Sequence, residues 1–275
     1  MAFTVVHPVH SQELWGIVEV SEVIHTGSII AIDGTAPVCG LEVMDVAAGA
    51  ANVTNLDIPL GVVTGNNDSA SNKTYDTSGE YVTAASTWHD KTTQFQGSEG
   101  PMAYGVTGAM VSYIPITPET VIRGPIRQAA IGTALTVSTV NSTTTGHSTG
   151  VGATFSTMAC TSVIGLATVY FRTGLNQGQY RVVETAHATT HTWTPGLPAD
   201  VVPGDTAVIA NVRAQGKSRA YIDTLGVYID GSAALTSNYL LIDVIRLDLS
   251  VAGDEYVEFR FNPINFNMID RFDTS

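Results

Sequence analysis

Charged side chains are scarce in this chain of 275 residues, of which only 13% are Asp, Glu, Lys or Arg. Average domains carry about 25% charged residues. So little charge suits a surface rich in Ser, Thr and Asn, or one partly covered by other subunits. Basic residues are scarcer than acidic ones, 12 against 25, which gives the chain a net charge of −13. This balance argues against general nucleic-acid binding, which needs a basic face. It suits simple solubility or the outward surface of a large assembly.

Cysteine is nearly absent, and its placement excludes a cysteine-based site. Cys39 and Cys160 lie far apart among small and apolar residues, and no CxxC pair occurs. A zinc knuckle or a redox pair is therefore not indicated, and buried free thiols are favoured over a disulfide. No apolar run of about 18 residues exists, so we expect no membrane-spanning helix. The opening MAFTVVHPVHSQELW has no basic region before an apolar core, so no secretory signal is expected.

A long amphipathic helical pattern is also missing, and only short helices near Val43–Asn52 and Ser232–Tyr239 fit the sequence. Short apolar runs separated by Gly, Pro, Asp and Asn recur instead, which is typical of short strands joined by tight turns. The block 24–65 shows this pattern of short strands and turns most clearly. Its runs are Ser28–Ile32, Leu41–Met44 and Leu60–Val63. We therefore predict an all-β fold with short strands and long loops.

Residues 1–23 are predicted to be an extended N-terminal arm and the first strand. Pro8 excludes a central strand position, while the run from Trp15 to Val20 reads as a strand. An apolar arm of this kind is a contact device between subunits or, alternatively, an edge strand lying on its own domain. The candidate capsid or subunit contacts in the arm are Phe3, Val5, Val9 and Trp15.

Residues 24–127 are predicted to form a first β domain interrupted by a polar excursion. Residues 66–98 are rich in turn formers, with one strand candidate at 81–83, and loops of this length are usually functional or partly mobile. Residues 99–127 return to period-two alternation in GPMAYGVTGAMVSYIPI, followed by VIRGPIR.

Residues 128–218 are predicted to be a Ser/Thr-rich β insertion or a second β domain. The part from 128 to 171 contains no charged residue, and half of residues 133–162 are Ser or Thr. Uncharged strands of high β propensity invite aggregation when a sheet edge is bare, so we expect them to be paired in an assembled state. This makes 128–171 a second contact candidate. Further strands are predicted at Gln179–Thr185, Thr190–Trp193 and Thr206–Val212, with turns at Asn176–Gly178 and Pro203–Asp205.

Residues 219–275 are predicted to be a C-terminal β-hairpin region. Tyr239–Leu249 and Tyr256–Asn262 flank a turn at Ala252–Asp254, and Arg219–Ile229 supplies a neighbouring strand. The alternation of apolar and polar residues predicts one buried face on Tyr239–Leu249 and one on Tyr256–Asn262. These faces are Leu241, Ile245, Leu247 and Leu249, and then Val257, Phe259 and Phe261.

The sequence contains no convincing group of catalytic or metal-binding residues. The pairs His7/His10 and His187/His191 lie outside helical sequence, so we expect surface histidines and no metal site. Neither GxSxG nor a P-loop occurs, and we expect Asp254-Glu255 to be a solvated turn. A glycosidase stays open, because its two carboxylates need only meet in space. The three tryptophans, however, show no clustering of the kind a sugar platform needs. We predict no catalytic, cofactor-binding or metal residues.

One block carries a resemblance to a known family. Its phrases are Gly27-Ser-Ile-Ile, Asp33-Gly34, Leu41-Glu-Val-Met and Ile58-Pro-Leu-Gly-Val-Val-Thr-Gly65. Together they resemble the small β-barrel, or β-tulip, unit of tailed-bacteriophage head decoration proteins. A later segment looks like a turn-and-strand phrase recurrent in phage virion proteins. It reads GLNQGQYRVV from Gly174 and PGDTAVI from Pro203.

The resemblance implies a small β-barrel or β-tulip-like domain plus a second β-rich region. It implies a non-enzymatic capsid decoration, or cement, protein that stabilises the head by binding across major capsid protein subunits. Such a protein sits as a homotrimer on the outer surface of the virion, after assembly in the bacterial cytoplasm, with no cofactor, nucleic acid or membrane partner. The alternative is another virion component, a tail, fibre or adhesion subunit that binds a host receptor or glycan. A secreted hydrolase or carbohydrate-binding module is disfavoured by the missing signal.

Overall fold

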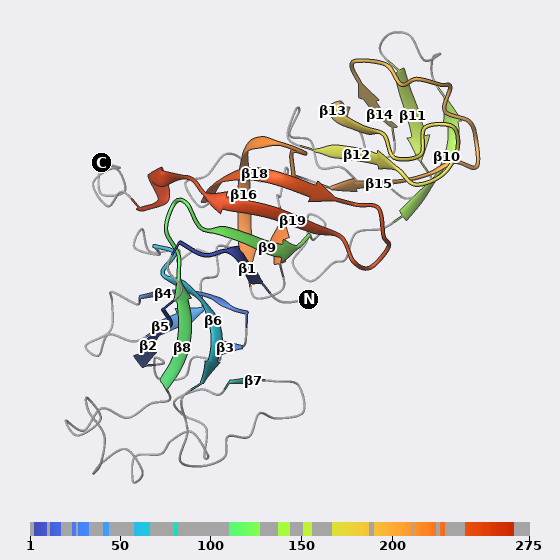
Figure 1. Ribbon diagram of the computed structural model, residues 1–275. Coiled ribbons are helices and arrows are strands. Elements are labelled where there is room, and N and C mark those ends of the chain that lie inside the picture. The colour runs from blue at the N-terminus through green and yellow to red at the C-terminus, as the bar shows by residue number, and fades with distance from the viewer. Residues whose placement is uncertain are drawn as a thin grey trace, which may run out of the picture. The chain divides into compact units, whose positions relative to one another are not determined.

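The computed structural model describes fifteen stretches of the chain (Figure 1). They are 3–9, 12–17, 24–25, 27–32, 41–43, 58–66, 80–81, 110–126, 137–143, 151–155, 167–186, 190–210, 212–223, 226–228 and 240–266. Within these stretches the regular structure is β-strand, apart from a 3-10 helix at Pro263–Phe266. The predicted all-β fold is confirmed. Both cysteines and both short-helix candidates lie outside the described residues, apart from Val43, which ends a strand.

The strands fall into sheets that each have a simple order. Their bounds are β1 Thr4–His7, β2 Leu14–Ile17, β3 Ile24–His25, β4 Ile29–Ile32, β5 Leu41–Val43, β6 Gly61–Asn66, β7 Glu80–Tyr81, β8 Met110–Pro115, β9 Val121–Pro125, β10 Val137–Thr143, β11 Val151–Phe155, β12 Thr168–Phe171, β13 Tyr180–Ala186, β14 Thr190–Trp193, β15 Thr206–Ala210, β16 Gly216–Asp223, β17 Gly226–Tyr228, β18 Leu240–Asp248 and β19 Tyr256–Phe261. The sheets are β1-β9-β19-β18-β16-β17, β2-β8-β6-β4-β5 and β3-β7, and β10-β11-β14-β13-β12-β15 closes into a barrel.

The chain divides into two compact units, of which one is mainly Arg123–Arg260 and the other mainly Ala2–Asp45, Ala51–Ile122 and Phe261–Ser275. In the latter, the five-stranded antiparallel sheet curls on itself. Gly16, on end strand β2, lies so close to the side chain of Leu41, on the opposite end strand β5, that a Cβ would overlap it. Four strands of the predicted 24–127 domain, β4, β5, β6 and β8, therefore form a curled, half-barrel sheet with β2, whereas β3 pairs with β7 and β9 belongs to the six-stranded sheet.

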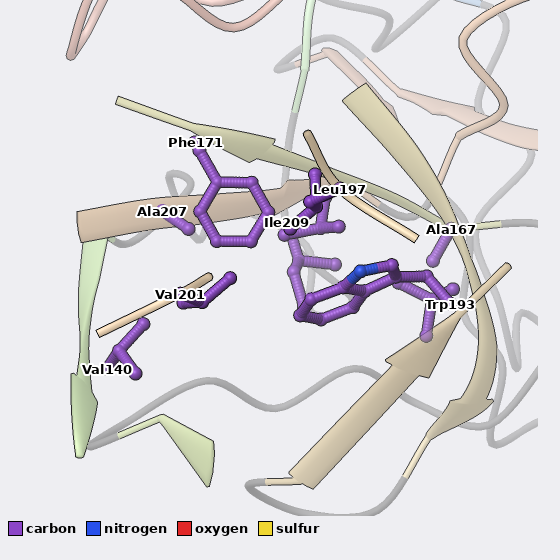
Figure 2. Close-up of a cluster of buried hydrophobic side chains, with 10 residues drawn as sticks. Val140, Ala167, Phe171, Trp193, Leu197, Val201, Ala207 and Ile209 are labelled. Carbon is purple, nitrogen blue, oxygen red and sulfur yellow. The ribbon is translucent and has the colours of Figure 1, made fainter. Parts of the chain in front are cut away.

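The closed barrel lies in the Ser/Thr-rich segment. Its strands are antiparallel throughout and pack around one apolar core (Figure 2). In that core Phe171 meets Trp193 edge-on, with ring centroids 5.5 Å apart and planes at 72°. The core residues are Val140, Ala167, Val169, Phe171, Val183, Trp193, Leu197, Val201, Ala207 and Ile209. The resemblance placed a barrel in 24–127, whereas the closed ring is formed by β10 to β15; neither a short sequence resemblance nor alternation says which strands close a ring.

The sheet of the C-terminal region curls as well. A parallel bridge joins Ile126, just after β9, to Val227 on β17, although these strands stand far apart in the sheet order. The segment predicted as one strand at Arg219–Ile229 is a hairpin of β16 and β17, paired through Tyr221↔Tyr228. Curling encloses an apolar interior, which is why Ala220, Ile222, Val227, Ile242, Val257 and Phe259 are buried.

The C-terminal hairpin confirms one predicted face and corrects the other. Val257, Phe259 and Phe261 are fully buried, as expected. On β18, however, the buried residues are Leu240, Ile242, Val244 and Leu247, and Leu249 just after the strand is buried as well. Ile245 is 43% exposed and Leu241 is half-buried, so the predicted face was wrong for these two. The alternation changes phase at Ile245–Arg246, where two successive residues are exposed, and an unbroken period of two misses that change.

Candidate functional site

The predicted contact residues separate into one buried and three accessible side chains. Phe3 is 2% exposed, and its backbone N–H donates to the Gly27 carbonyl at 3.1 Å. Val5 is half-buried, whereas Val9 is 48% and Trp15 45% exposed. Phe3 thus packs within its own chain, and Val9 and Trp15 face solvent.

Sequence reasoning missed a further accessible apolar residue beside Trp15. Leu14 is 41% exposed and belongs to the same end strand, β2. One edge of β2 pairs with β8 from Leu14↔Tyr113 to Ile17↔Met110. Among the described strands none pairs with its other edge. Leu14 and Trp15 are neighbours in a strand, so they point to opposite faces. The strand thus offers apolar surface on both sides of one sheet edge, and the dipeptide Leu-Trp was the signal available in the sequence.

The described residues hold no group of three or more His, Cys, Asp or Glu side chains placed to bind a metal. His7 is exposed, whereas His191 is fully buried in β14, so the expectation of a surface histidine was wrong there. The closed barrel turns alternate residues of a strand inward, which places His191 and Trp193 inside. His10 and His187 lie outside the described residues. No helix in the described stretches is long and apolar enough to span a membrane.

Two loops at one end of the barrel are tied together by polar side chains. Asn176 is fully buried, donating from Nδ2 to the Ala199 carbonyl at 3.0 Å and accepting at Oδ1 from the Ala199 N–H at 3.1 Å. Asp205 accepts from the Val202 N–H at 3.1 Å. Gly174 has a φ of +81°, and a Cβ there would overlap the Asp205 carboxylate. The loop between β12 and β13 and the loop between β14 and β15 are therefore held against each other, and they are called the loop pair below.

That loop pair carries two exposed apolar side chains. Leu175 is 83% exposed on the first loop, and Val202 is 49% exposed on the second. Sequence reasoning predicted turns in both segments and gave these two side chains no role, although an apolar residue at a turn tip was a visible signal. Both turn predictions themselves are confirmed, with positive φ at Gly178 and Gly204.

A buried ion pair fastens the barrel to the turn between β18 and β19. The Arg172 Nη2 lies 2.5 Å from the Glu255 Oε1, and its Nε donates to the Leu249 carbonyl at 2.9 Å. The other oxygen of Glu255 accepts from the Gly253 N–H at 2.9 Å. Glu255 is only 8% exposed, which corrects the expectation of a solvated turn carboxylate. Only its neighbour Asp254 is exposed.

A polar network crosses β9, β19 and β18. The Arg123 guanidinium lies 4.5 Å from the Tyr256 ring centre and pairs with Glu258 at 2.6 Å, which raises the pKa of Arg123. Asp248 accepts from the Ser250 hydroxyl at 2.6 Å and the Tyr256 hydroxyl at 3.3 Å. The Ser250 hydroxyl is the main reason that the pKa of Asp248 is lowered. Asp248 also pairs with Arg246 at 3.0 Å. The Arg123–Glu258 pair and the Tyr256–Asp248 hydrogen bond therefore brace neighbouring strands.

A scan against protein-family models finds no match, and searches of curated proteins and of solved structures find none either. The exposed apolar side chains of β2, Leu14 and Trp15, are the candidate functional site.

Proposed function

We propose that this chain is a non-enzymatic structural protein of a virion, a decoration or cement protein of a phage head. It binds across major capsid protein subunits on the outer surface of the capsid, as a homotrimer. The proposal rests on the resemblance of the block from Gly27 to Gly65 to head decoration proteins. The observation that carries it in the fold is the exposed pair Leu14 and Trp15 on end strand β2.

An exposed tryptophan on a sheet edge suits a binding contact. Burying a large apolar side chain contributes about 1.5–3 kcal/mol, and tryptophan is enriched among the residues that dominate interfaces. A sheet edge also offers unpaired N–H and C=O groups to which a partner strand can add. At Trp15 a partner can therefore bury the indole ring and also form hydrogen bonds with the backbone of the strand edge.

Contacts of this kind would stabilise the capsid by shifting the equilibrium toward the assembled shell. A protein that binds the assembled, expanded shell but not its separated subunits stabilises the shell by its binding free energy. A subunit that spans several coat proteins gains this stabilisation at each junction. No reacting group is required, and the acidic excess keeps the outer surface of the particle soluble.

The test is rebinding to heads that lack the protein. Purified chain is titrated onto expanded heads, and bound chain is measured by sedimentation with the heads. We expect saturable binding, and about tenfold weaker binding for Trp15→Ser, because a buried aromatic anchor is lost. Val251→Ser is the matched control, since Val251 is 57% exposed and belongs to the β18–β19 turn, not to β2. Absence of wild-type binding contradicts the decoration role.

A further inference from the structure

The net negative charge of the chain is concentrated in the compact unit that contains β2. This unit, made of Ala2–Asp45, Ala51–Ile122 and Phe261–Ser275, holds 15 acidic and 3 basic residues. The other unit is almost neutral, with 10 acidic and 9 basic residues. Residues 1–72 contain no Lys or Arg at all. The exposed pair Leu14 and Trp15 therefore belongs to the strongly acidic unit.

The five-stranded sheet of that unit shows the same charge bias. Its strands read LWGI, MVSYIP, GVVTGN, IIAI and LEV, in the order β2, β8, β6, β4 and β5, and contain no Lys or Arg. Glu13, which immediately precedes β2, is exposed and forms no ion pair with any other residue of the described stretches. A partner that reaches this end of the sheet therefore meets a negative charge with no cation of the sheet beside it.

The two faces of β2 offer different contacts. Alternation along an extended chain places Glu13 and Trp15 on one face and Leu14 on the other. A carboxylate attracts a cation directly, and an indole ring attracts one through the negative charge of its face. Leu14, 41% exposed, offers apolar surface on the opposite side. One face of the strand thus favours Lys or Arg in a partner, and the other favours an apolar residue.

The backbone of β2 fixes how such a partner lies. In an antiparallel ladder a strand directs its N–H and C=O groups alternately to its two sides. Strand β8 pairs with one side, from Leu14↔Tyr113 to Ile17↔Met110, and no strand of the described stretches pairs with the other (Figure 1). A strand added at that side brings its side chains to about 4.5–5.5 Å from those of β2. Side chains on both faces of the added strand are then in contact with β2.

We infer that β2 receives an extended segment of the partner in which Lys or Arg alternates with apolar residues. The cations of this segment face Glu13 and Trp15, and its apolar side chains pack on Leu14. The acidic excess of the unit steers a basic segment toward this edge. Edge-to-edge pairing of two copies would instead bring two acidic edges together. The inference names the partner of the contact proposed above and rests on the proposed function for the choice of β2, but its test needs no heads.

Synthetic peptides test this chemistry on the full chain. Three fluorescein-labelled peptides are used, repeats of Lys-Val, of Glu-Val and of Lys-Pro, each about eight residues long, which is the length of an ordinary strand. Fluorescence anisotropy measures their dissociation constants from about 1 to about 100 µM chain. We expect the Lys-Val peptide to bind about tenfold or more tightly than the other two, and to weaken with added salt. The Glu-Val peptide has the wrong charge, and the Lys-Pro peptide keeps the charge but cannot extend a ladder.

Substitutions locate the binding on β2. Trp15→Ser should raise the dissociation constant of the Lys-Val peptide about tenfold, because the aromatic contact is lost. Glu13→Lys should weaken binding about tenfold as well, because it opposes the cations of the peptide with a like charge. Glu119→Lys is the matched control, since it makes the same charge change at an exposed glutamate of the same unit, in the turn before β9. It should have a much smaller effect. Circular dichroism and urea unfolding verify that each variant folds.

Three results overturn the inference. The first is a Lys-Val peptide that binds no better than the Glu-Val peptide, or not at all. The second is equal weakening by Glu13→Lys and Glu119→Lys, which would mean that net charge alone attracts the peptide. The third is Trp15-dependent self-association of the chain without peptide, measured by sedimentation, which would assign the edge to a second copy. A chain that gives any of these results but binds heads keeps the decoration role. Selective, Trp15-dependent binding of the Lys-Val peptide by a chain that does not bind heads supports the inference and contradicts decoration alone.

Discussion

Arg172 and Glu255 form an ion pair in which both side chains are almost wholly withdrawn from water, with 9% and 7% of their surfaces exposed. Arg172 follows the barrel strand β12, and Glu255 precedes β19, 83 positions later. The pair therefore joins the Ser/Thr-rich barrel to the C-terminal hairpin, and both belong to the same compact unit. The barrel is held on that hairpin by charge and backbone hydrogen bonds together.

Removing the arginine of this pair should strongly destabilise the chain. Arg172→Ala leaves the Glu255 carboxylate buried without its cation, which typically costs about 3–5 kcal/mol. Urea unfolding measures this loss. Arg246→Ala is the control, because its pair with Asp248 has the arginine side chain 56% exposed, and such pairs contribute about 0–1 kcal/mol. Equal effects of the two substitutions contradict the assigned role of the Arg172 pair.

Gly174 should tolerate a side chain less well than Gly178. Both have positive φ, +81° and +85°, so alanine costs about 1–2 kcal/mol at either position from backbone strain. At Gly174 the added Cβ also overlaps the Asp205 carboxylate, whereas at Gly178 it meets nothing within 4 Å. Gly174→Ala should therefore lower the free energy of unfolding further than Gly178→Ala. Indistinguishable losses refute the close approach of Gly174 and Asp205.

Gly61 should be needed to seat the ring of Tyr113. The two residues lie on the paired strands β6 and β8, and a Cβ on Gly61 would overlap the Tyr113 ring. We expect Gly61→Ala to cost about 1–3 kcal/mol by overpacking. Tyr113→Ala in the same chain should remove the part of that cost due to the ring, while the close approach to the Ile114 carbonyl remains, so a double-mutant cycle measures the coupling of Gly61 and Tyr113. Additive effects would show that the ring does not constrain this position.

The acid stability of the C-terminal hairpin should depend on Ser250. Its hydroxyl is the largest cause of the lowered pKa of Asp248. A carboxylate whose folded pKa is depressed stabilises the fold above its unfolded pKa, about 3.9, and that stabilisation is lost as pH falls through the folded value. Ser250→Ala should therefore raise the pKa of Asp248 and move its titration toward the unfolded value. Carboxyl NMR titration measures this, and an unchanged Asp248 pKa refutes the role of the hydroxyl.

Local patterns in the sequence predict local structure well. The strand Thr190–Trp193 has the predicted bounds, and the turns at Gly178, Gly204 and Gly253 each contain a glycine with positive φ. Turn residues act through their own backbone, so their signal lies in adjacent positions. The alternation of Val257, Phe259 and Phe261 was also readable, because no irregularity interrupts β19.

Features that depend on residues distant in the sequence could not be predicted from local patterns. Closure of the barrel joins β10 to β15 across more than sixty positions, and alternation does not specify such a partner. The burial of Glu255 depends on Arg172, and the burial of His191 on the closure of the ring. The sequence named Phe3, Val5, Val9 and Trp15 alike as contact candidates, and it did not distinguish the exposed Val9 and Trp15 from the buried Phe3, whose N–H donates to the distant Gly27 carbonyl.

The central claim is that the chain decorates a phage head, and its copy number in purified virions tests this most directly. Quantitative mass spectrometry with isotope-labelled peptides measures the ratio of this chain to the major capsid protein. A decoration protein predicts hundreds of copies in each particle, comparable with the coat subunit. A few dozen copies or fewer would contradict decoration and favour a tail, fibre or adhesion subunit, and absence from the particle would contradict a virion role altogether.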